Sequence, residues 1–166
     1  RAGVGPQDVA LAIIAAVFKC GFVKNKVMEF VGEGIGNLSV EYRNGIDVMT
    51  TETTCLSSIW ETDEKVEGWY KTHKRPEDYA KLSPQEGATY EGLIEVDLST
   101  IEPMIALPHS PDHVCAVSEV AGMKIDQVCI GSCTNSSYQD MMRVARILKS
   151  KRVHPNVSLV IGPGSR

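Results

Sequence analysis

Two cysteines, Cys129 and Cys133, lie four residues apart in the segment CIGSCTNSSYQD, residues 129–140. A thiolate can attack an electrophile, exchange with a disulfide, or bind iron or zinc. The pattern predicts that Cys133 lies in a turn between a short apolar strand and the start of a helix. Ligands of open α/β sheets gather at such strand ends, and the unpaired N–H groups of a helix N-terminus favour a thiolate. A metal ligand, a nucleophile, a redox thiol and a core residue are all compatible with this position.

The residues that follow Gly131 suit a ligated sulfur. Gly131 would let the backbone come close to a bulky group, and Thr134 and Asn135 could hydrogen-bond the sulfur. The spacing between Cys129 and Cys133 is by itself a poor metal signal. Cys129 is instead expected to pack inside the sheet as a small apolar residue.

Other polar clusters give weaker signals. A nucleophilic cysteine needs a histidine base, and none of the four histidines stands in an arrangement that indicates one: His73, His109, His113 and His154. His109, Asp112 and His113 could chelate a metal, but two histidines in a proline-containing loop are more often solvated polar residues. The GEGIG stretch, residues 32–36, matches neither nucleotide-binding fingerprint fully, so a structural turn is favoured over a phosphate site.

The composition limits the class of protein and partner. The chain has 166 residues, 43% of them hydrophobic and 23% charged, with a net charge of −4. This balance weighs against a nucleic-acid partner or a membrane surface. The longest apolar run, residues 9–18, is shorter than the roughly 20 residues that span a bilayer. Five irregularly spaced cysteines favour a reducing compartment over a disulfide scaffold. The expected location is the cytoplasm, or the mitochondrial matrix in a eukaryote.

The expected elements of the first two thirds mix helices and strands. Apolar periodicity, Pro6 and Gly21 predict a first helix over residues 6–18. Later helices are expected at 38–42, closed by Asn44-Gly45, and at 47–60, 63–74 and 76–82. Strands are expected at 27–31 and, from period-two alternation, at 93–99. The loop at 107–113 is expected to lead into a connector between two units.

The last third gives a sharper pattern. Residues 125–130 predict a strand, 131–135 a turn, and 157–161 a second strand. Between them a helix capped by Ser136 or Ser137 should run to about residue 150. Its apolar face is expected to pack through Met141, Val144, Ala145 and Leu148. Strand, turn, helix and strand form a parallel α/β unit.

The stretch GSCTNSSYQDM, residues 131–141, resembles the signature segment of the aconitase family, which includes aconitases, homoaconitases and the large subunits of isopropylmalate dehydratases. Other stretches resemble further parts of that family: GPQDVALAII, VMEFVGEGI, IDVMTTETTCLSSIW, LIEVDLSTIEP, the LPHSPD loop and VIGPGSR. The resemblance covers nearly the whole chain.

The resemblance implies a hydro-lyase that dehydrates and rehydrates a hydroxy-polycarboxylic acid such as citrate or isocitrate. It implies a [4Fe–4S] cluster with one open iron, which binds the substrate. Cys133 matches the first cluster cysteine, and Glu52 matches a glutamate that exchanges a proton with the substrate hydroxyl or bound water. Ser132, Thr134 and Asn135 would support the cluster from beside Cys133.

The resemblance also implies an aconitase-like α/β/α three-layer domain over residues 1–122 and the truncated start of a second such domain over 123–166. Both ends of the chain look cut, so a longer polypeptide is expected to supply the remaining domains and two further cluster cysteines. We expect this chain alone to be inactive. Val48 replaces an asparagine common in the family. That departure favours one alternative, a hydratase of another hydroxy-diacid. A non-catalytic iron or redox sensor is a further alternative that the resemblance leaves open.

Overall fold

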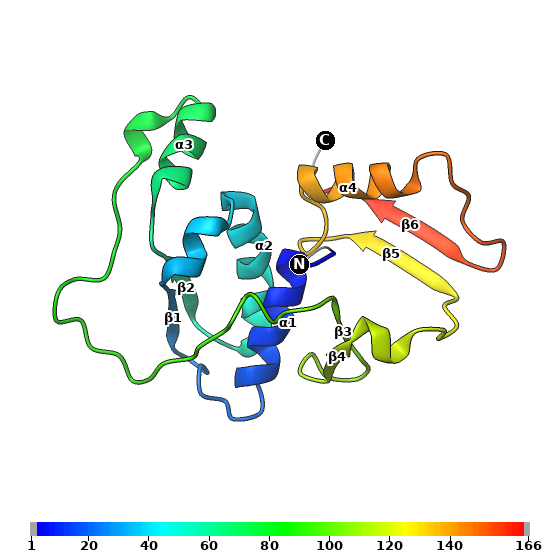
Figure 1. Ribbon diagram of the computed structural model, residues 1–166, viewed down its shortest axis with the longest axis horizontal. Coiled ribbons are helices and arrows are strands. Elements are labelled where there is room, and N and C mark those ends of the chain that lie inside the picture. Colours follow the sequence, from blue (N-terminus) through cyan, green and yellow to red (C-terminus); the bar gives the residue numbers. More distant parts are fainter. Residues whose placement is uncertain (1–2, 165–166) are drawn as a thin grey trace. The chain divides into compact units, whose positions relative to one another are not determined.

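The structure is a computed structural model that describes residues 3–164 (Figure 1). The chain forms two compact units, residues 1–116 and residues 117–166, and each is described by itself. The division follows Ala116, six residues before the expected boundary at 122. Loop 107–113 was expected to lead out of the first unit. It instead closes a hairpin within that unit, because β3 (Met104–Ala106) pairs antiparallel with β4 (Val114–Ala116).

The first unit is built around a parallel strand pair and two helices. Its regular elements are α1 (Pro6–Val17), β1 (Val27–Phe30), η1 (Glu33–Asn37), α2 (Val40–Thr50), η2 (Thr51–Thr53), β2 (Ser57–Trp60), α3 (Glu64–Thr72), η3 (Pro76–Asp78), β3 and β4. Strands β1 and β2 pair in parallel, with Val27 opposite Ser57 and Phe30 opposite Trp60. Helix α2 lies in the crossover between them, so the unit contains a β–α–β connection.

Helix α1 forms the centre of the hydrophobic core, as its sequence predicts. Pro6 occupies the first turn, and the Asp8 carboxylate accepts the Gly5 N–H at 2.6 Å. The same carboxylate accepts the Met104 N–H at 2.7 Å and so ties the start of α1 to β3. Most side chains of α1 are buried, and Ala10 is completely inaccessible to solvent. Burial of an apolar helix on most sides stabilises the unit more than helix propensity does.

Helix α2 contradicts two predictions. It runs through Asn44-Gly45, where the sequence pattern predicted a helix end. A Cβ on Gly45 would come within 2.7 Å of the Pro6 ring, so the glycine allows α1 to pack closely on α2. The helix predicted over 47–60 is also wrong. Its second half forms β2, because Trp60 stacks on Phe30 at a centroid distance of 4.3 Å and pairs with β1.

A buried arginine joins α2 to its surroundings. Arg43, of which 3% is exposed, donates hydrogen bonds to the carbonyl oxygens of Ile35 and Leu38 and to the Asp63 carboxylate. Asp63 also caps α3, accepting the Val66 N–H at 3.2 Å. Burial acts to raise the pKa of Asp63, but the hydrogen bond from Arg43, that N–H and the Arg43 charge together hold it below its usual value.

The segment after η3 has no strand, although one was predicted at 93–99. Ile94, Val96 and Leu98 are half-buried against the core, and the residues between them are exposed. The alternation of apolar and polar residues therefore reflects burial of one side of an extended segment. Within the described residues this segment does not pair with a strand. An ion pair at 2.5 Å joins the Glu91 carboxylate, just before this segment, to the Lys26 ammonium, just before β1.

The second unit is the predicted parallel α/β connection. It contains η4 (Val117–Val120), β5 (Gln127–Gly131), α4 (Tyr138–Leu148) and β6 (Ser158–Gly162). Strands β5 and β6 pair in parallel from Gln127 opposite Ser158 to Gly131 opposite Gly162. Of the two serines considered as a cap, Ser137 is the one, accepting the Asp140 N–H at 3.1 Å. The α/β fold class predicted from the sequence is confirmed.

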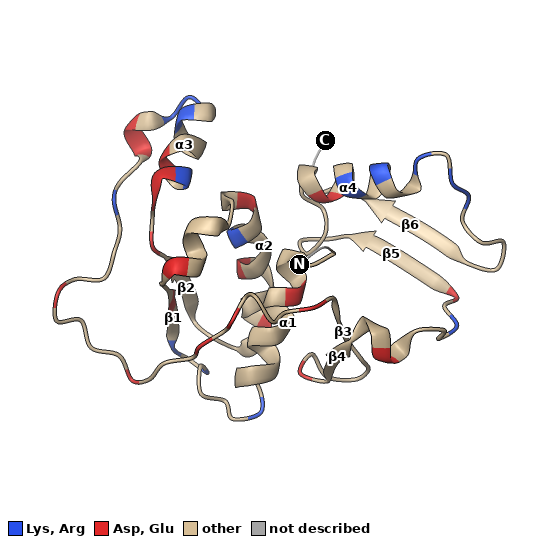
Figure 2. Cartoon of the chain, in the orientation of Figure 1, with Lys and Arg blue, Asp and Glu red and all other residues tan. Residues whose placement is uncertain are grey.

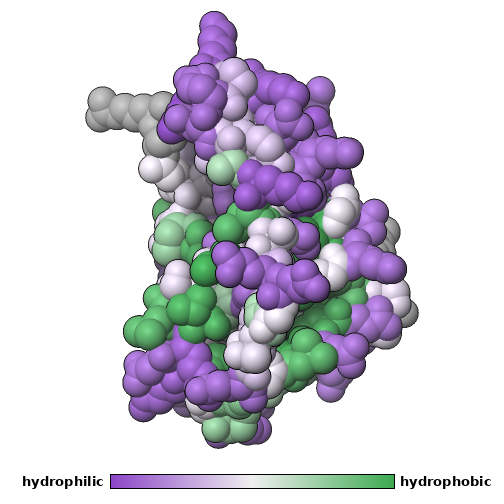
Figure 3. Space-filling model, turned by 90° about the vertical axis from the view of Figure 1, so that its left-hand side faces the viewer, coloured by the Kyte–Doolittle hydropathy of each residue, from purple (hydrophilic) through white to green (hydrophobic). Residues whose placement is uncertain are grey.

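The surface mixes charged and apolar residues. Figure 2 shows basic positions in blue along α4 and the loop after it. In the sequence, residues 143–152 contain Arg143, Arg146, Lys149, Lys151 and Arg152. In Figure 3 polar side chains dominate the upper part of the face shown, and apolar side chains are exposed lower down. Within residues 3–164, no helix is both long enough and apolar enough to cross a membrane.

Candidate functional site

Cys133 lies in the turn between β5 and α4, as predicted. Its thiol is exposed to solvent. The Ser132 hydroxyl lies 3.8 Å from the sulfur and the Thr134 hydroxyl 3.9 Å from it, one on each side along the chain. Asn135 contributes through its backbone, because its N–H donates to the Gly131 carbonyl oxygen at 3.1 Å and closes the turn. The turn therefore presents one thiol between two hydroxyl groups.

Two residues with unusual backbone conformation make this turn sharp. Gly131 has φ +146 and Ser132 has φ +64. A Cβ on Gly131 would overlap the carbonyl oxygen of Gly162 and lie 3.1 Å from its carbonyl carbon. The sequence suggested that Gly131 makes room for a bulky group. In the structure it makes room for the backbone of β6.

The prediction for Cys129 is wrong. Cys129 is exposed, whereas Val128 and Ile130 on either side of it are half-buried. Side chains alternate between the two faces of a strand, so Cys129 lies on the opposite face from Val128 and Ile130. The half-buried apolar side chains of α4 are Met141, Val144 and Leu148. Cys129 lies opposite Val160, of which 52% is exposed, on the other face of the strand pair. Ala145, predicted on the packed face of α4, is exposed as well.

Glu52 lies on η2, the short turn that follows α2, and not inside the longer helix that was predicted. Its side chain is exposed, and among residues 3–164 its carboxylate has no hydrogen-bond or ion-pair partner. The turn around it is firmly built. The Thr53 hydroxyl, in a residue only 2% exposed, donates to the Thr50 carbonyl oxygen at 2.6 Å, and Thr54 has φ +63. Val48 is half-buried one helical turn earlier on α2.

Glu52 belongs to the first unit and Cys133 to the second. Within the described residues, no group of three or more His, Cys, Asp or Glu side chains is close enough together to hold a metal ion. In loop 107–113 the Asp112 carboxylate accepts the Ser110 hydroxyl, and its other oxygen lies 4.0 Å from the Lys19 ammonium. The polar residues of that loop thus stabilise the loop. The Cys133 thiol is exposed, and a thiolate is a group that can ligate iron or zinc.

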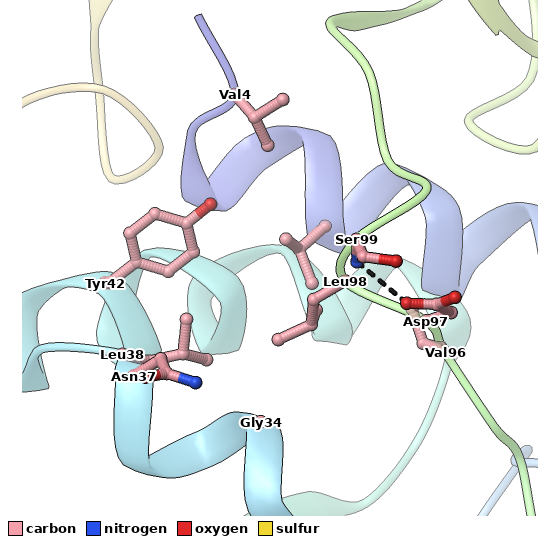
Figure 4. Close-up of a pocket in the computed structure, with 10 residues that line it drawn as sticks. Val4, Gly34, Asn37, Leu38, Tyr42, Val96, Asp97, Leu98 and Ser99 are labelled. Atoms are coloured by element: carbon pink, nitrogen blue, oxygen red, sulfur yellow. Dashed lines mark hydrogen bonds between the residues drawn. The ribbon is translucent and has the colours of Figure 1, made fainter. Parts of the chain in front are cut away.

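The first unit also has an open hollow of about 650 Å³ that the sequence did not predict (Figure 4). It lies between α1, η1 and the extended segment, and its lining includes Val9, Leu38, Val96 and Leu98. At its rim Asp97 accepts the Ser99 N–H at 2.8 Å, and hydrogen bonds from Ser99 lower the pKa of Asp97. No signal pointed to this hollow, because residues 93–99 were expected to pair in a sheet.

The GEGIG stretch supports the structural interpretation. Residues 33–37 form η1, in which Ile35 is buried and its carbonyl oxygen accepts Arg43 at 3.0 Å. Gly32, with φ +110, lets the chain enter this turn from β1.

A comparison of the sequence with known protein families finds a family that matches two segments of the chain. The sequence model of the Aconitase family (aconitate hydratase) matches residues 1–123 and residues 116–166. The chain belongs to the aconitase family. The resemblance seen in the signature segment around Cys133 is thereby confirmed over the whole chain.

Individual relatives carry a more specific name. The chain is 39% identical over 163 residues to the 3-isopropylmalate dehydratase large subunit 2 of Rubrobacter xylanophilus. It is 40% identical over 166 residues to large subunit 1 of Thermotoga maritima and 39% identical over 163 residues to the large subunit of Clostridium kluyveri. These alignments cover 98%, 99% and 98% of this chain and 38%, 40% and 38% of the relatives. The chain thus spans about two fifths of the length of the relatives it matches.

Proposed function

We propose that the full-length polypeptide containing this chain is an iron–sulfur hydro-lyase acting on a hydroxy-diacid of the 3-isopropylmalate type. The observation that carries this proposal is the 39% identity, over 98% of the chain, to a 3-isopropylmalate dehydratase large subunit. Because that name describes one subunit of an enzyme, we also propose that the full-length polypeptide assembles with a smaller subunit.

Cys133 is proposed to hold a [4Fe–4S] cluster together with two cysteines from outside this chain. Its exposed thiol and the hydroxyls of Ser132 and Thr134 support this role. Asn135 would support it by closing the turn. When bound, such a cluster supplies a Lewis acid that polarises a hydroxyl group. The chain alone offers one such ligand, so we propose that it is inactive by itself.

Glu52 is proposed to exchange the proton of the substrate hydroxyl or of water. A carboxylate that has no partner among residues 3–164 and that lies exposed on a fixed turn can accept and return a proton. A Glu52→Gln variant keeps the shape and removes this capacity. We expect it to bind the cluster normally and to lose about 100-fold or more in turnover.

Citrate or isocitrate is the second candidate substrate, favoured by the family description, aconitate hydratase. A panel of hydroxy-di- and tricarboxylic acids, assayed with the reconstituted full-length enzyme, separates the two. A third possibility, a non-catalytic iron or redox sensor, predicts a cluster without turnover of any acid in the panel.

The first test is anaerobic reconstitution of the full-length polypeptide with iron and sulfide, followed by visible absorption and EPR. We expect a cluster in the parent and its loss or destabilisation in Cys133→Ser. Cys129→Ser is the matched control, because Cys129 is also exposed but lies in the middle of β5, outside the turn. A parent without a cluster, or equal spectra for parent and Cys133→Ser, would refute the proposed role.

A further inference from the structure

The turn that carries Cys133 is held from outside by the end of β6. At its start, Gly131 lies so close to Gly162 that no side chain fits between them. At its end, the Gly164 N–H donates to the Ser136 carbonyl oxygen at 3.4 Å. Residues 162–164 therefore contact the turn on both sides of the cysteine, and a break at either contact would free one end of the turn.

Gly164 is constrained by what lies opposite it. A Cβ at Gly164 would overlap the Ser136 hydroxyl oxygen and lie 3.1 Å from the Ser136 Cβ. The hydroxyl could rotate away, but the Cβ cannot, so the backbone at Ser136 would have to shift by a few tenths of an ångström. Ser136 directly precedes the helix cap Ser137 and lies three residues after Cys133.

We propose that Gly164 is a positioning residue for Cys133, acting through Ser136. Its missing side chain leaves room for Ser136, and its N–H holds the Ser136 backbone, so that turn 131–136 keeps one conformation. This inference rests on the proposed function of Cys133 as a cluster ligand, but its first readout does not require a cluster.

The test compares Gly164→Ala with Gly162→Ala in the full-length polypeptide. Gly162 is a matched control, because it lies two residues away and a Cβ there meets no atom within 4 Å. Hydrogen exchange is measured first on the cluster-free protein, for the peptide 129–141, which contains the Asn135 N–H bonded to Gly131. We expect about 10-fold faster exchange there in Gly164→Ala, with Gly162→Ala and a peptide from α1 unchanged.

The second readout is the half-life of the reconstituted cluster, followed by its visible absorption. Residues that orient a metal ligand typically change metal affinity by about 10- to 100-fold, and we expect about a 10-fold shorter half-life in Gly164→Ala. Removing the whole Ser136 side chain in a Ser136→Gly, Gly164→Ala double variant relieves both the hydroxyl and the Cβ contact and should recover most of the loss. If Gly164→Ala alone does not fold, this double variant must fold, and its failure to do so would overturn the proposal.

The outcomes separate this inference from the proposed function. A parent that forms no cluster defeats the proposed function, while the exchange measurement still tests the positioning. A Cys133-dependent cluster combined with identical behaviour of Gly164→Ala and Gly162→Ala overturns the positioning alone. Faster exchange in the α1 peptide as well as in 129–141 would show a general loss of stability and would also overturn it.

Discussion

Replacing Asp63 by Asn should destabilise the first unit by about 2 kcal/mol at neutral pH. Removing one partner from a fully buried ion pair costs about 3–5 kcal/mol, because a charge is left uncompensated. Arg43 meets that condition at 3% exposure, but the Asp63 side chain is 29% exposed, so solvent screening reduces the loss. Asn keeps the cap at the start of α3, so the measured change reports the lost carboxylate charge.

The pH dependence gives the sharper check. The folded-state pKa of Asp63 lies below its usual value, so this carboxylate contributes stability above its unfolded pKa. That contribution is lost as the pH falls through the lowered folded pKa. The difference in free energy of unfolding between the parent and Asp63→Asn should therefore be largest near neutral pH. It should decline below about pH 4 and approach zero in stronger acid.

Urea unfolding of the 166-residue chain, followed by tryptophan fluorescence, measures this difference. Both tryptophans, Trp60 and Trp69, lie in the first unit, so the signal reports that unit. Asp78→Asn is the control, because its ion pair with Arg75 is exposed and should contribute less than about 1 kcal/mol. A loss below about 0.5 kcal/mol for Asp63→Asn, or a loss that persists unchanged in strong acid, would contradict the reasoning.

Two further substitutions test the packing and the electrostatics of the first unit. Gly45→Ala should destabilise it by about 1–2 kcal/mol in urea unfolding, because the Pro6 ring lies 2.7 Å from the new Cβ. The control Gly68→Ala, with open space around its new Cβ on α3, should stabilise the unit by up to about 1 kcal/mol. Equal effects of the two substitutions would show that helix propensity outweighs packing at Gly45. Glu29→Gln should lower the pKa of Tyr90 toward its usual value, because the hydrogen bond from the Tyr90 hydroxyl to the Glu29 carboxylate is the main cause of the raised pKa. An ultraviolet titration of the Tyr90 phenol measures this pKa, and an unchanged pKa in the variant would refute the prediction.

The second unit was predictable because its signals are local. A capping serine, an amphipathic helix face and two short apolar runs each specify their own element, and their order specifies a parallel connection. What the sequence missed there depends on a distant segment. The close approach of Gly162 to Gly131 and the exposure of Cys129 follow from the pairing of β5 with β6 and from the single helix that covers the pair.

The first unit was harder to predict because distant contacts override local patterns. The local pattern predicted that a helix ends at Gly45. In the structure the helix continues, and the missing side chain of Gly45 leaves room for Pro6 of α1. The threonine-rich stretch before Trp60 looked like a weak helix, yet the stack on Phe30 and pairing with β1 place Trp60 in a strand. Glu52 was found only through the family resemblance, because an exposed glutamate at the end of a helix carries no chemical signal by itself.

The two proposed functional side chains share one kind of local arrangement. Glu52 lies on η2 after α2, and Cys133 lies two residues after the end of β5; each turn is closed by a backbone hydrogen bond and has a residue with left-handed backbone within two positions. Each turn is fixed, whereas the functional group itself is exposed. A complete active site would bury these groups against substrate and further ligands. Among residues 3–164 the Glu52 carboxylate has no partner, and no group of three or more His, Cys, Asp or Glu side chains is close enough together to hold a metal ion. Folding of each unit therefore fixes the backbone around one proposed functional group and leaves that group exposed.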